Sequence, residues 1–424
     1  MSQAGLAARK AAHSILQQVT VDGRLMSEII GAGALDGLAL DDRARAQRLA
    51  TETLRGLDRA DKLLRPHLKK KPPVFVQNAM RLGTIELATD GSAHGVVNSY
   101  VELVSRNKRT QAMKGLVNAV LRKIADTANE NWGKSAVPVM PKWLRGPLTE
   151  AWGQKAIAGI ERAHFAGAPL DLSPKADADS VVRATGGKLL PSGSVRVSDA
   201  EQVSRMAGFI EGSWWVQDAA AAMPVKLLDP QSGDRVLDLC AAPGGKTLQL
   251  ASLGANVTAV DVSESRMRRV QENLKRTGLT AETVVSDAFE FAESGFDAVL
   301  LDAPCSATGT IRRHPDLPYA KDGSEFGQLI AQQEAMIDHA RTLLRPGGAL
   351  VFCTCSLLPD EGEVQVEEAL ARHTDLIVDR SVLKKPWIDP DWITEEGGVR
   401  LRPDFWPDQG GMDGFYMAVL RKGS

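Results

Sequence analysis

The chain has 424 residues, of which 43% are hydrophobic and 25% charged, and its formal net charge is −2. This composition is that of an ordinary globular protein with room for two or three domains. The four cysteines lack the spacing of a secreted disulfide scaffold, and neither a signal peptide nor a membrane span is visible in the sequence, so we expect a cytoplasmic protein.

Basic residues are concentrated in the N-terminal third of the chain. Residues 1–136 carry 21 Lys and Arg against 13 Asp and Glu, whereas the remainder carries 30 against 40. The clusters are Lys69, Lys70 and Lys71, followed by Arg106, Lys108, Arg109, Lys114, Arg122 and Lys123. Such cations can neutralise the phosphates of an RNA, although a solvated helix surface explains any one cluster equally well.

The first part of the chain predicts a helical bundle. Residues 1–127 are rich in Ala, Leu, Arg and Gln, and apolar residues recur at helical spacing, as in Val117, Val120 and Ile124. Residues 128–140 contain glycine and proline and are predicted to form a linker. Residues 141–215 begin with a helical pattern and continue in short apolar runs, which predicts a small α+β segment.

Residues 216–424 alternate between strand and helix patterns. Strands are expected at 235–239, 257–260, 283–285, 297–301 and 349–352, with helices at 264–276 and 325–344 among them. This alternation favours a doubly wound, mostly parallel sheet, in which a ligand binds at the carboxyl ends of the strands.

A glycine-rich turn follows the first of these strands. It spans Asp238–Thr247 (DLCAAPGGKT), and its paired glycines let the backbone approach a ligand while the next helix presents free amides. A Walker A loop is excluded because Cys240 stands where its first glycine is required, and the turn lacks the G-x-G-x-x-G pattern of dinucleotide sites. An adenosyl nucleoside without a pyrophosphate fits what remains.

Acidic residues stand at the ends of successive strands. Asp261 ends the second strand, where a carboxylate can accept hydrogen bonds from both hydroxyls of a ribose, and Asp287 follows the third, where it can accept from an adenine amino group. Each acid alone is equally well explained as a helix N-cap or turn former. Together with Asp238, they suggest S-adenosyl-L-methionine (SAM) as the cofactor.

Two cysteines occupy the positions that one reaction requires. Cys305 lies in Asp302–Gly309 (DAPCSATG) after the fourth strand, and Cys355 lies in Thr354–Ser356 after the fifth. The C5 carbon of cytosine becomes nucleophilic only after a thiolate adds at C6, and a second thiol can assist loss of the C5 proton and release of the enzyme. Because adjacent strand ends bring the two thiols together, the pair suggests covalent methylation of a pyrimidine ring.

The nucleophile needs help to ionise, because a free cysteine has a pKa of about 8.5. Lys246 is a candidate cation for this role, and Asp302 could bond the amino group and ring nitrogen of cytosine. Cys240 and Cys353 lie in or next to apolar runs and are interpreted as buried small hydrophobes. A zinc site is disfavoured because the cysteines lack paired C-x2-C spacing, and no metal is expected.

These motifs resemble those of the RNA cytosine-5 methyltransferases of the NOL/NOP/Sun group. The resemblance rests on the three segments around the glycine-rich turn and the two cysteines, and Arg312–Asp316 (RRHPD) is similar to the bacterial RsmB or Sun-type ribosomal RNA branch. Val97–Leu103 and Gly115–Arg122 look like parts of a NusB-type RNA-binding bundle. The resemblance implies a Rossmann-like SAM-dependent methyltransferase core with a mostly parallel seven-stranded sheet, preceded by an all-α NusB-like domain.

The resemblance also implies roles for particular residues. Cys355 would be the nucleophile, Cys305 would assist release of the product, Asp302 would contact the base, and Lys246 would complete the catalytic group. The residues implied to hold SAM are Cys240, Ala241, Ala242, Pro243, Gly244, Gly245, Lys246, Asp261, Arg266, Asp287 and Asp302. The implied substrate is a cytosine of small-subunit (16S) ribosomal RNA, bound by a monomer without metal or membrane.

One segment departs from the family, and other functions stay open. Where relatives usually carry a Leu-Arg-Val-Asn-like strand, residues 169–175 read PLDLSPK, without the arginine and the asparagine. The alternatives are methylation of transfer RNA, a non-catalytic RNA-binding assembly factor on the same fold, and a dehydrogenase. Retention of both cysteines and all the acids argues against the assembly factor, and the missing dinucleotide fingerprint argues against the dehydrogenase.

Overall fold

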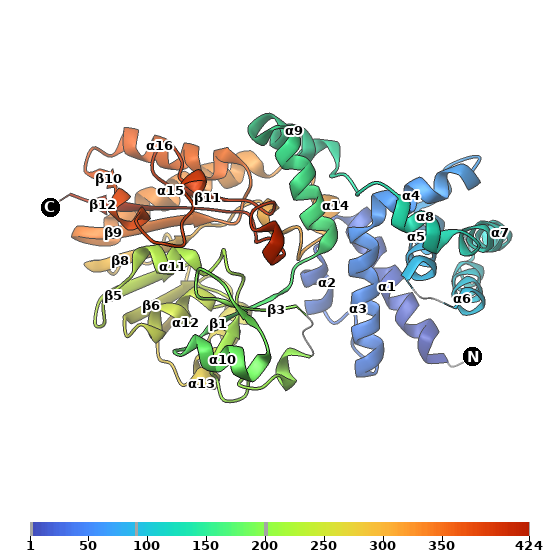
Figure 1. Cartoon of the computed structure of the whole chain (residues 1–424), viewed down its shortest axis with the longest axis horizontal. Helices are drawn as coiled ribbons and strands as arrows, with labels where there is room; N and C mark the ends of the chain where they lie inside the picture. The colour runs from blue at the N-terminus through green and yellow to red at the C-terminus, as the bar shows by residue number, and fades with distance from the viewer. Residues whose placement is uncertain (1–2, 90–91, 199–201, 424) are drawn as a thin grey trace. The chain divides into compact units, whose positions relative to one another are not determined.

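The protein folds into two compact units. The computed structural model describes residues 3–89, 92–198 and 202–423. The first unit consists of Met1–Gly167 together with Ile311–Asp322, and the second consists of Ala168–Thr310 and Gly323–Ser424 (Figure 1). No helix in the described parts of the chain combines the length and the apolar character that crossing a bilayer demands.

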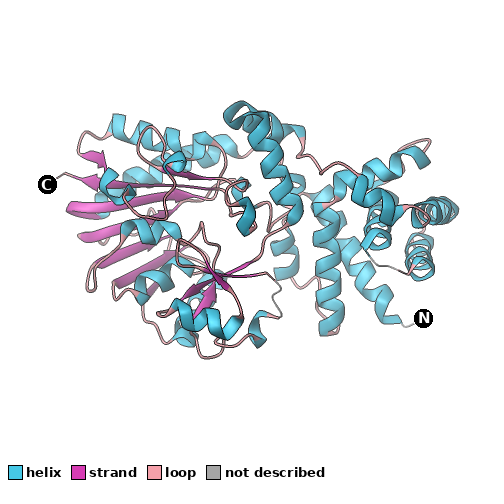
Figure 2. Ribbon diagram, viewed as in Figure 1, coloured by secondary structure: helices cyan, strands magenta, loops and turns pink. Residues whose placement is uncertain are grey.

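The first unit is helical, and its described residues contain no strand (Figure 2). Its N-terminal bundle buries a single apolar core, in which Val117, Val120 and Ile124 are all at most 3% exposed, so the all-α prediction is confirmed. Its helices are α1 Gln3–Asp22, α2 Met26–Gly31, α3 Leu40–Arg55, α4 Leu57–Leu64, α5 Val74–Thr89, α6 Ala93–Arg106, α7 Lys114–Ala125, α8 Ala128–Lys134, α9 Lys142–Ala166 and α14 Leu317–Ala320, with 3-10 turns η1 Arg65–His67 and η2 Gln111–Met113.

Helix α8 lies in the stretch that the sequence predicts as a linker. The guanidinium of Arg59 donates hydrogen bonds to the carbonyls of Trp132 (2.9 Å), Ser135 (2.8 Å) and Ala136 (3.1 Å), and it lies 5.0 Å from the centroid of the Trp132 ring. These contacts anchor the helix and the residues after it to α4. The local signals of glycine and proline do not reveal them, because the partner is distant in the sequence.

The segment Ile311–Asp322 follows the Cys305 motif in sequence but belongs to the first unit. The Asp316 carboxylate accepts a hydrogen bond from the Met26 amide (2.8 Å), and the Arg312 carbonyl accepts one from the Arg55 guanidinium (3.1 Å). The Trp143 indole donates to the Pro318 carbonyl at 3.2 Å. The Arg-Arg-His-Pro sequence suggests an exposed loop, yet the Arg312 side chain is fully buried.

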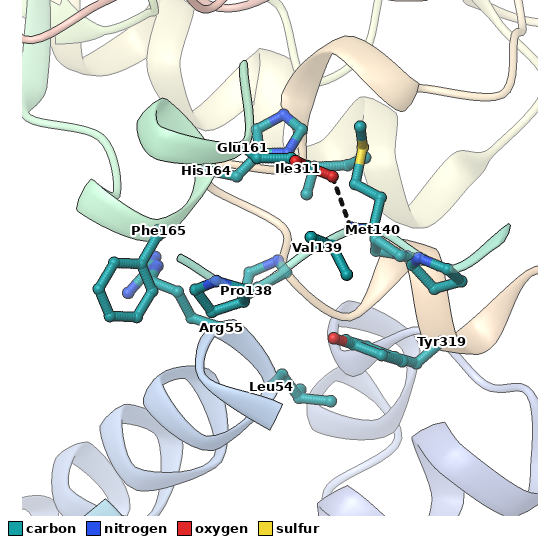
Figure 3. Close-up of a pocket in the computed structure, with 13 residues that line it drawn as sticks. Leu54, Arg55, Pro138, Val139, Met140, Glu161, His164, Phe165, Ile311 and Tyr319 are labelled. Carbon is teal, nitrogen blue, oxygen red and sulfur yellow. Dashed lines mark hydrogen bonds between the residues drawn. The ribbon is translucent and has the colours of Figure 1, made fainter. Parts of the chain in front are cut away.

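A cavity of about 40 Å³ lies within the first unit (Figure 3). Its lining includes His164 and Glu161 of α9, Arg55 of α3, and Tyr319. Neither ring nitrogen of His164 has a hydrogen-bond partner among the described residues. Burial and, secondarily, the charges of Arg312 and Arg55 lower the pKa of His164 to about 3, so this imidazole stays neutral in the folded protein.

His164 is therefore expected to weaken the protein in acid. Below pH 6.5 the unfolded chain protonates this histidine and the folded chain does not, so the unfolded state binds more protons and stability falls as the pH drops from about 6.5 towards 3. We expect His164→Leu to reduce the stability lost between pH 7.5 and 4.5 by about 2 kcal/mol, measured by urea unfolding. The matched control is His94→Leu, which removes an exposed histidine. Equal pH dependence in wild type and His164→Leu would contradict the prediction.

The second unit begins with a small four-stranded segment, whereas α9, which the sequence analysis assigns to the same 141–215 segment, belongs to the first unit. The four strands of this segment are antiparallel in the order β2-β3-β1-β4. In β1, the Asp171 carboxylate pairs with both arms of Arg196 (2.6 and 2.7 Å), and the Ser173 hydroxyl donates to Gln217 at 2.8 Å. In β1, the strand whose sequence departs from the family pattern, the polar side chains of Asp171 and Ser173 thus bind other side chains of the same unit. The elements are β1 Leu170–Pro174, α10 Ala178–Thr185, β2 Lys188–Leu189, β3 Val195–Val197, η3 Val203–Arg205 and β4 Trp214–Val216.

The core of the second unit is a mostly parallel sheet in the order β10-β12-β9-β8-β5-β6-β7, which confirms the predicted seven-stranded sheet. A short additional strand, β11, pairs with β12. The strands are β5 Arg235–Leu239, β6 Asn256–Asp261, β7 Glu282–Val285, β8 Phe296–Asp302, β9 Leu344–Thr354, β10 Leu376–Val378, β11 Val399–Leu401 and β12 Phe415–Lys422. The helices are α11 Met223–Leu228, α12 Gly245–Ser252, α13 Glu264–Thr277, α15 Phe326–Leu343 and α16 Glu363–Arg372, with 3-10 turns η4 Thr308–Thr310, η5 Pro359–Glu361, η6 Arg380–Leu383, η7 Pro390–Trp392 and η8 Pro407–Gln409.

Helices cover both faces of this sheet (Figure 1). Val236 packs into a core with α11 and α12, whereas its neighbour Leu237 packs into a second core with α15 and α16. The alternation follows from the period of two along a strand. Because β7, β6, β5, β8 and β9 run parallel, their carboxyl ends meet at one edge, where the polar residues of the glycine-rich turn and the cysteine motifs gather.

Candidate active site

The glycine-rich turn leaves β5 and enters α12. Gly244 has φ 99°, a left-handed conformation, and a Cβ added there would come within 3.0 Å of the Val270 side chain. Cys240 also adopts a left-handed conformation, with φ 61°. The Ala241 amide donates to the Val260 carbonyl at 3.0 Å, so the turn Cys240–Gly244 lies against the end of β6. Ala242 and Pro243 complete it, and Gly245 begins α12.

Asp238 is a buried carboxyl beneath this turn. Its Oδ2 accepts a hydrogen bond from the Thr247 hydroxyl (2.6 Å), and its Oδ1 has no partner among the described residues. Burial, with smaller contributions from the charges of Asp302 and Asp261, raises the pKa of Asp238 to about 7. A buried carboxyl group with a pKa near 7 at the end of a strand is characteristic of a functional site.

Asp261 ends β6 and is also buried. Its carboxylate accepts hydrogen bonds from the amides of Ala242 (3.0 Å) and Ser263 (2.9 Å), and Arg266 of α13 approaches it at 3.6 Å. Arg266 also donates to the Ala242 carbonyl. Asp261 and Arg266 therefore brace the glycine-rich turn, and the carboxylate retains lone pairs to accept a ligand hydroxyl.

Asp287 is exposed beyond the end of β7, and its carboxylate accepts the Phe289 amide at 2.9 Å. This contact is the turn-forming arrangement that explains the residue without a ligand. Two exposed apolar side chains lie near these acids in sequence: Val262, 69% exposed, and Phe289, 42% exposed. The sequence analysis missed them, although an apolar residue directly after a strand-end acid is a usable signal.

Lys246 and Asp302 form a buried ion pair at the centre of the edge. Lys246 Nζ donates to Asp302 Oδ2 at 2.8 Å and lies 5.0 Å from the centroid of the Phe415 ring. Burial opposes the Lys246 charge, but the carboxylate of Asp302 outweighs it, so the pKa of Lys246 is raised above its usual range. Asp302 Oδ1 accepts a weak hydrogen bond from the Cys353 thiol at 3.6 Å.

The structure brings the two motif cysteines together. Strands β8 and β9 are neighbours with Asp302 opposite Cys353, so the loops that follow them start side by side. The Gly309 amide donates to the Cys355 carbonyl (2.9 Å), and the sulfur atoms of Cys305 and Cys355 lie 3.5 Å apart. The hydrogen bond with Cys355, then burial, raises the pKa of Cys305 well above its ordinary value.

The other two thiols remain protonated for a simpler reason. Burial, followed by the charges of the nearby aspartates, raises the pKa of Cys240 to about 12, and burial likewise raises the pKa of Cys353. Cys353 is fully buried in the core below the sheet, whereas Cys240 is half-buried. Across the described residues, no three His, Cys, Asp or Glu side chains gather in a way that would hold a metal ion.

Comparisons with known proteins agree with this geometry. A family model for 16S rRNA methyltransferase RsmB/F matches residues 225–421, and one for the NusB family matches residues 6–126. Ribosomal RNA small subunit methyltransferase B of Erwinia tasmaniensis is 33% identical over 438 residues, which cover 96% of this chain and 96% of that protein. The chain belongs to the RsmB/F family of RNA methyltransferases.

Solved structures show the same fold. The crystal structure of PH0851 superposes with a TM-score of 0.75 at 23% identity and covers 98% of this chain and 99% of its own. NSun6 from Pyrococcus horikoshii with SFG has a TM-score of 0.57 at 20% identity, covering 67% of this chain and 98% of its own. The predicted Rossmann-like core and NusB-like bundle are therefore confirmed for this member of the family.

The NusB-like bundle carries its cations on the surface. The side chains predicted to contact RNA are all exposed: Lys69, Lys70, Lys71, Arg106, Lys108, Arg109, Lys114, Arg122 and Lys123. Arg106 pairs with Glu102 and Arg122 donates to Asn118, so part of this charge is already engaged within single helices. Their exposure leaves these cations accessible to the phosphates of an RNA.

Proposed function

We propose that this protein transfers a methyl group from SAM to C5 of a cytosine in 16S ribosomal RNA through a covalent bond between Cys355 and C6. The observation that carries the proposal is the pair of thiols 3.5 Å apart, beside the buried Lys246–Asp302 ion pair. An RNA-binding assembly factor needs neither thiol. A dehydrogenase needs a dinucleotide site, which the turn after β5 does not provide.

The residues at the strand ends fit SAM. The unpartnered buried Oδ1 of Asp238, the buried Asp261 and the exposed side chain of Val262 provide polar and apolar contacts for an adenosyl group. NSun6 from Pyrococcus horikoshii, which shares the fold, was crystallised with SFG, a SAM analogue. In this arrangement Gly244 and Gly245 leave room for the methionine part, Asp261 accepts the ribose hydroxyls and Asp287 accepts from the adenine. SAM supplies an electrophilic methyl group.

The chain's own residues carry the proton and bond changes. The Cys355 thiolate would form a bond to C6, and the electron pair of the C5–C6 double bond would then take the methyl group at C5 as the methyl–sulfur bond breaks and S-adenosylhomocysteine leaves. Asp302, held by Lys246, accepts a hydrogen bond from the amino group of the base and so favours cytosine. Cys305 assists removal of the C5 proton, after which the double bond forms again and the Cys355–C6 bond breaks.

The NusB-like bundle would then hold the RNA. Its exposed cations carry the electrostatic part of the binding, and the methyltransferase core selects the base. In the departing strand, Asp171 and Ser173 are engaged with Arg196 and Gln217, so RNA contacts there would come from neighbouring elements.

The direct test is a methylation assay with radiolabelled SAM. We expect label in unmodified 16S ribosomal RNA, recovered as 5-methylcytidine after nuclease digestion, and little label in total transfer RNA assayed in parallel. Preferential labelling of transfer RNA would replace the proposed substrate, and label at another atom of the base would refute the two-thiol chemistry. RNA binding without any label would favour the assembly factor.

A further inference from the structure

Glu361 is a fully buried carboxylate in the loop after β9. Its Oε1 accepts hydrogen bonds from the Ser306 amide (2.9 Å) and from Nε2 of Gln333 (3.1 Å), and its Oε2 accepts the Ser306 hydroxyl (2.5 Å). All three donors are neutral groups. The carboxylate therefore holds Ser306, the residue after Cys305, by hydrogen bonds from both its backbone amide and its side chain.

The same residue is tied to the other thiol segment. The Thr354 hydroxyl donates to the Glu361 carbonyl at 2.7 Å, and Thr354 directly precedes Cys355. Gln333 of α15 adds a third attachment, because its Nε2 also donates to the Pro304 carbonyl (2.8 Å), next to Cys305. Glu361 thus connects the segments of both cysteines, and Gln333 fixes the Cys305 segment from the opposite side.

The Glu361 carboxylate has a structural and an electrostatic effect. Its three hydrogen bonds offset the desolvation cost of a buried charge, and its loss would leave the donors of Ser306 and Gln333 unpaired. The charge also acts on the chemistry, because after the effects of the Cys355 hydrogen bond, burial and the Cys355 charge, Glu361 contributes to the raised pKa of Cys305. Both effects act on Cys305, whereas Cys355 directly follows β9, which is fixed by its ladders with β8 and β12.

We propose that Glu361 is a positioning residue that holds Cys305 against Cys355 and so controls the release step of the reaction. The inference rests on the two-thiol chemistry proposed above. Without the carboxylate, the Cys305 loop loses its anchor, while Cys355, directly after β9, keeps the support of that strand. Bond formation with the RNA then continues, and elimination slows.

The test compares covalent protein–RNA adduct with turnover in the full-length protein. Glu361→Gln keeps the shape of the side chain but removes its negative charge and replaces the oxygen that accepts the Ser306 hydroxyl with an amide NH₂, so that this hydroxyl must turn and accept instead. We expect this variant to lose turnover by about 10- to 100-fold and to accumulate adduct on a denaturing gel, as Cys305→Ala does, while adduct forms at close to the wild-type rate. The matched control is Asp338→Asn on α15, the helix of Gln333, whose carboxylate pairs with Arg372 and His373 away from the thiol loops. This control should release RNA normally.

Parallel loss of adduct formation and turnover in Glu361→Gln, or wild-type release, would overturn the inference. Two further variants serve if Glu361→Gln does not fold. Ser306→Ala and Gln333→Met each remove a hydrogen-bond donor to the same carboxylate and should accumulate adduct more weakly. Absence of adduct in both would also overturn the positioning role. If Cys305→Ala accumulates adduct but Glu361→Gln, Ser306→Ala and Gln333→Met do not, the positioning role of Glu361 is rejected and the two-thiol chemistry stands. No adduct in Cys305→Ala rejects the proposed chemistry and the inference with it.

Discussion

Cys355→Ala is expected to abolish methyl transfer, by about 10³-fold or more, whereas Cys305→Ala is expected to leave the protein covalently attached to RNA. The two sulfurs are only 3.5 Å apart, so position alone does not separate their roles. The roles follow from the motifs, which assign the nucleophile to Cys355, and the loop of Cys305 is held separately by Glu361 through Ser306. Incubation with labelled SAM and 16S ribosomal RNA, followed by a denaturing gel, reports both outcomes.

The double variant provides the control for this experiment. Cys305→Ala in combination with Cys355→Ala should give neither methylated RNA nor adduct, because the adduct seen with Cys305→Ala depends on Cys355. SAM binding and the unfolding midpoint should stay close to wild type in all three proteins, since the sulfur atoms replaced are small and half-buried. Adduct in Cys355→Ala with none in Cys305→Ala would exchange the two roles.

The sheet and the position of the site could be predicted because each depends on a local pattern. Apolar runs at 235–239 and 297–301 became β5 and β8, and the acids and cysteines that follow such runs gather at one edge because parallel strands end together. Three residues of the glycine-rich turn, Asp238, Gly244 and Lys246, likewise occupy positions that the motif alone specifies.

The features that sequence reasoning did not find depend on contacts between distant positions. Glu361 meets Ser306 across 55 residues, and no spacing within its own segment marks it. Arg312 lies in the RRHPD motif, and nothing in that motif shows that its side chain is fully buried and that its segment joins the helical unit. The helix α8 formed in a predicted linker because Arg59, far upstream, supplies its contacts. In each case, contacts with residues distant in the sequence determine the local structure.

Lys246→Met is expected to cost about 1–3 kcal/mol of unfolding free energy near pH 8, because it removes the cation that pairs with Asp302 and leaves that carboxylate, 33% exposed, without its partner. Lys246 is 7% exposed, and its Nζ lies 2.8 Å from Asp302. Methyl transfer should fall sharply as well, since Asp302 would lose the contact that orients it towards the base. The matched control is Lys385→Met, which breaks an exposed pair with Asp229 and should cost less than about 1 kcal/mol.

The pH dependence of this loss distinguishes electrostatics from packing. The raised pKa of Lys246 means that its contribution to wild-type stability is fully present below the lysine's ordinary pKa of 10.5 and is lost only at higher pH. In the variant, Asp238 loses the nearby cation of Lys246, which lowers its pKa in the wild type. The pKa of Asp238 is already about 7, so without this cation the folded state binds a proton there more readily. Proton uptake by the folded variant raises its stability as the pH falls, so the deficit of Lys246→Met should narrow between pH 8 and pH 5.5 in urea unfolding. A deficit that is equal at both pH values would mean that lost packing against Phe415, rather than an uncompensated charge, destabilises the variant.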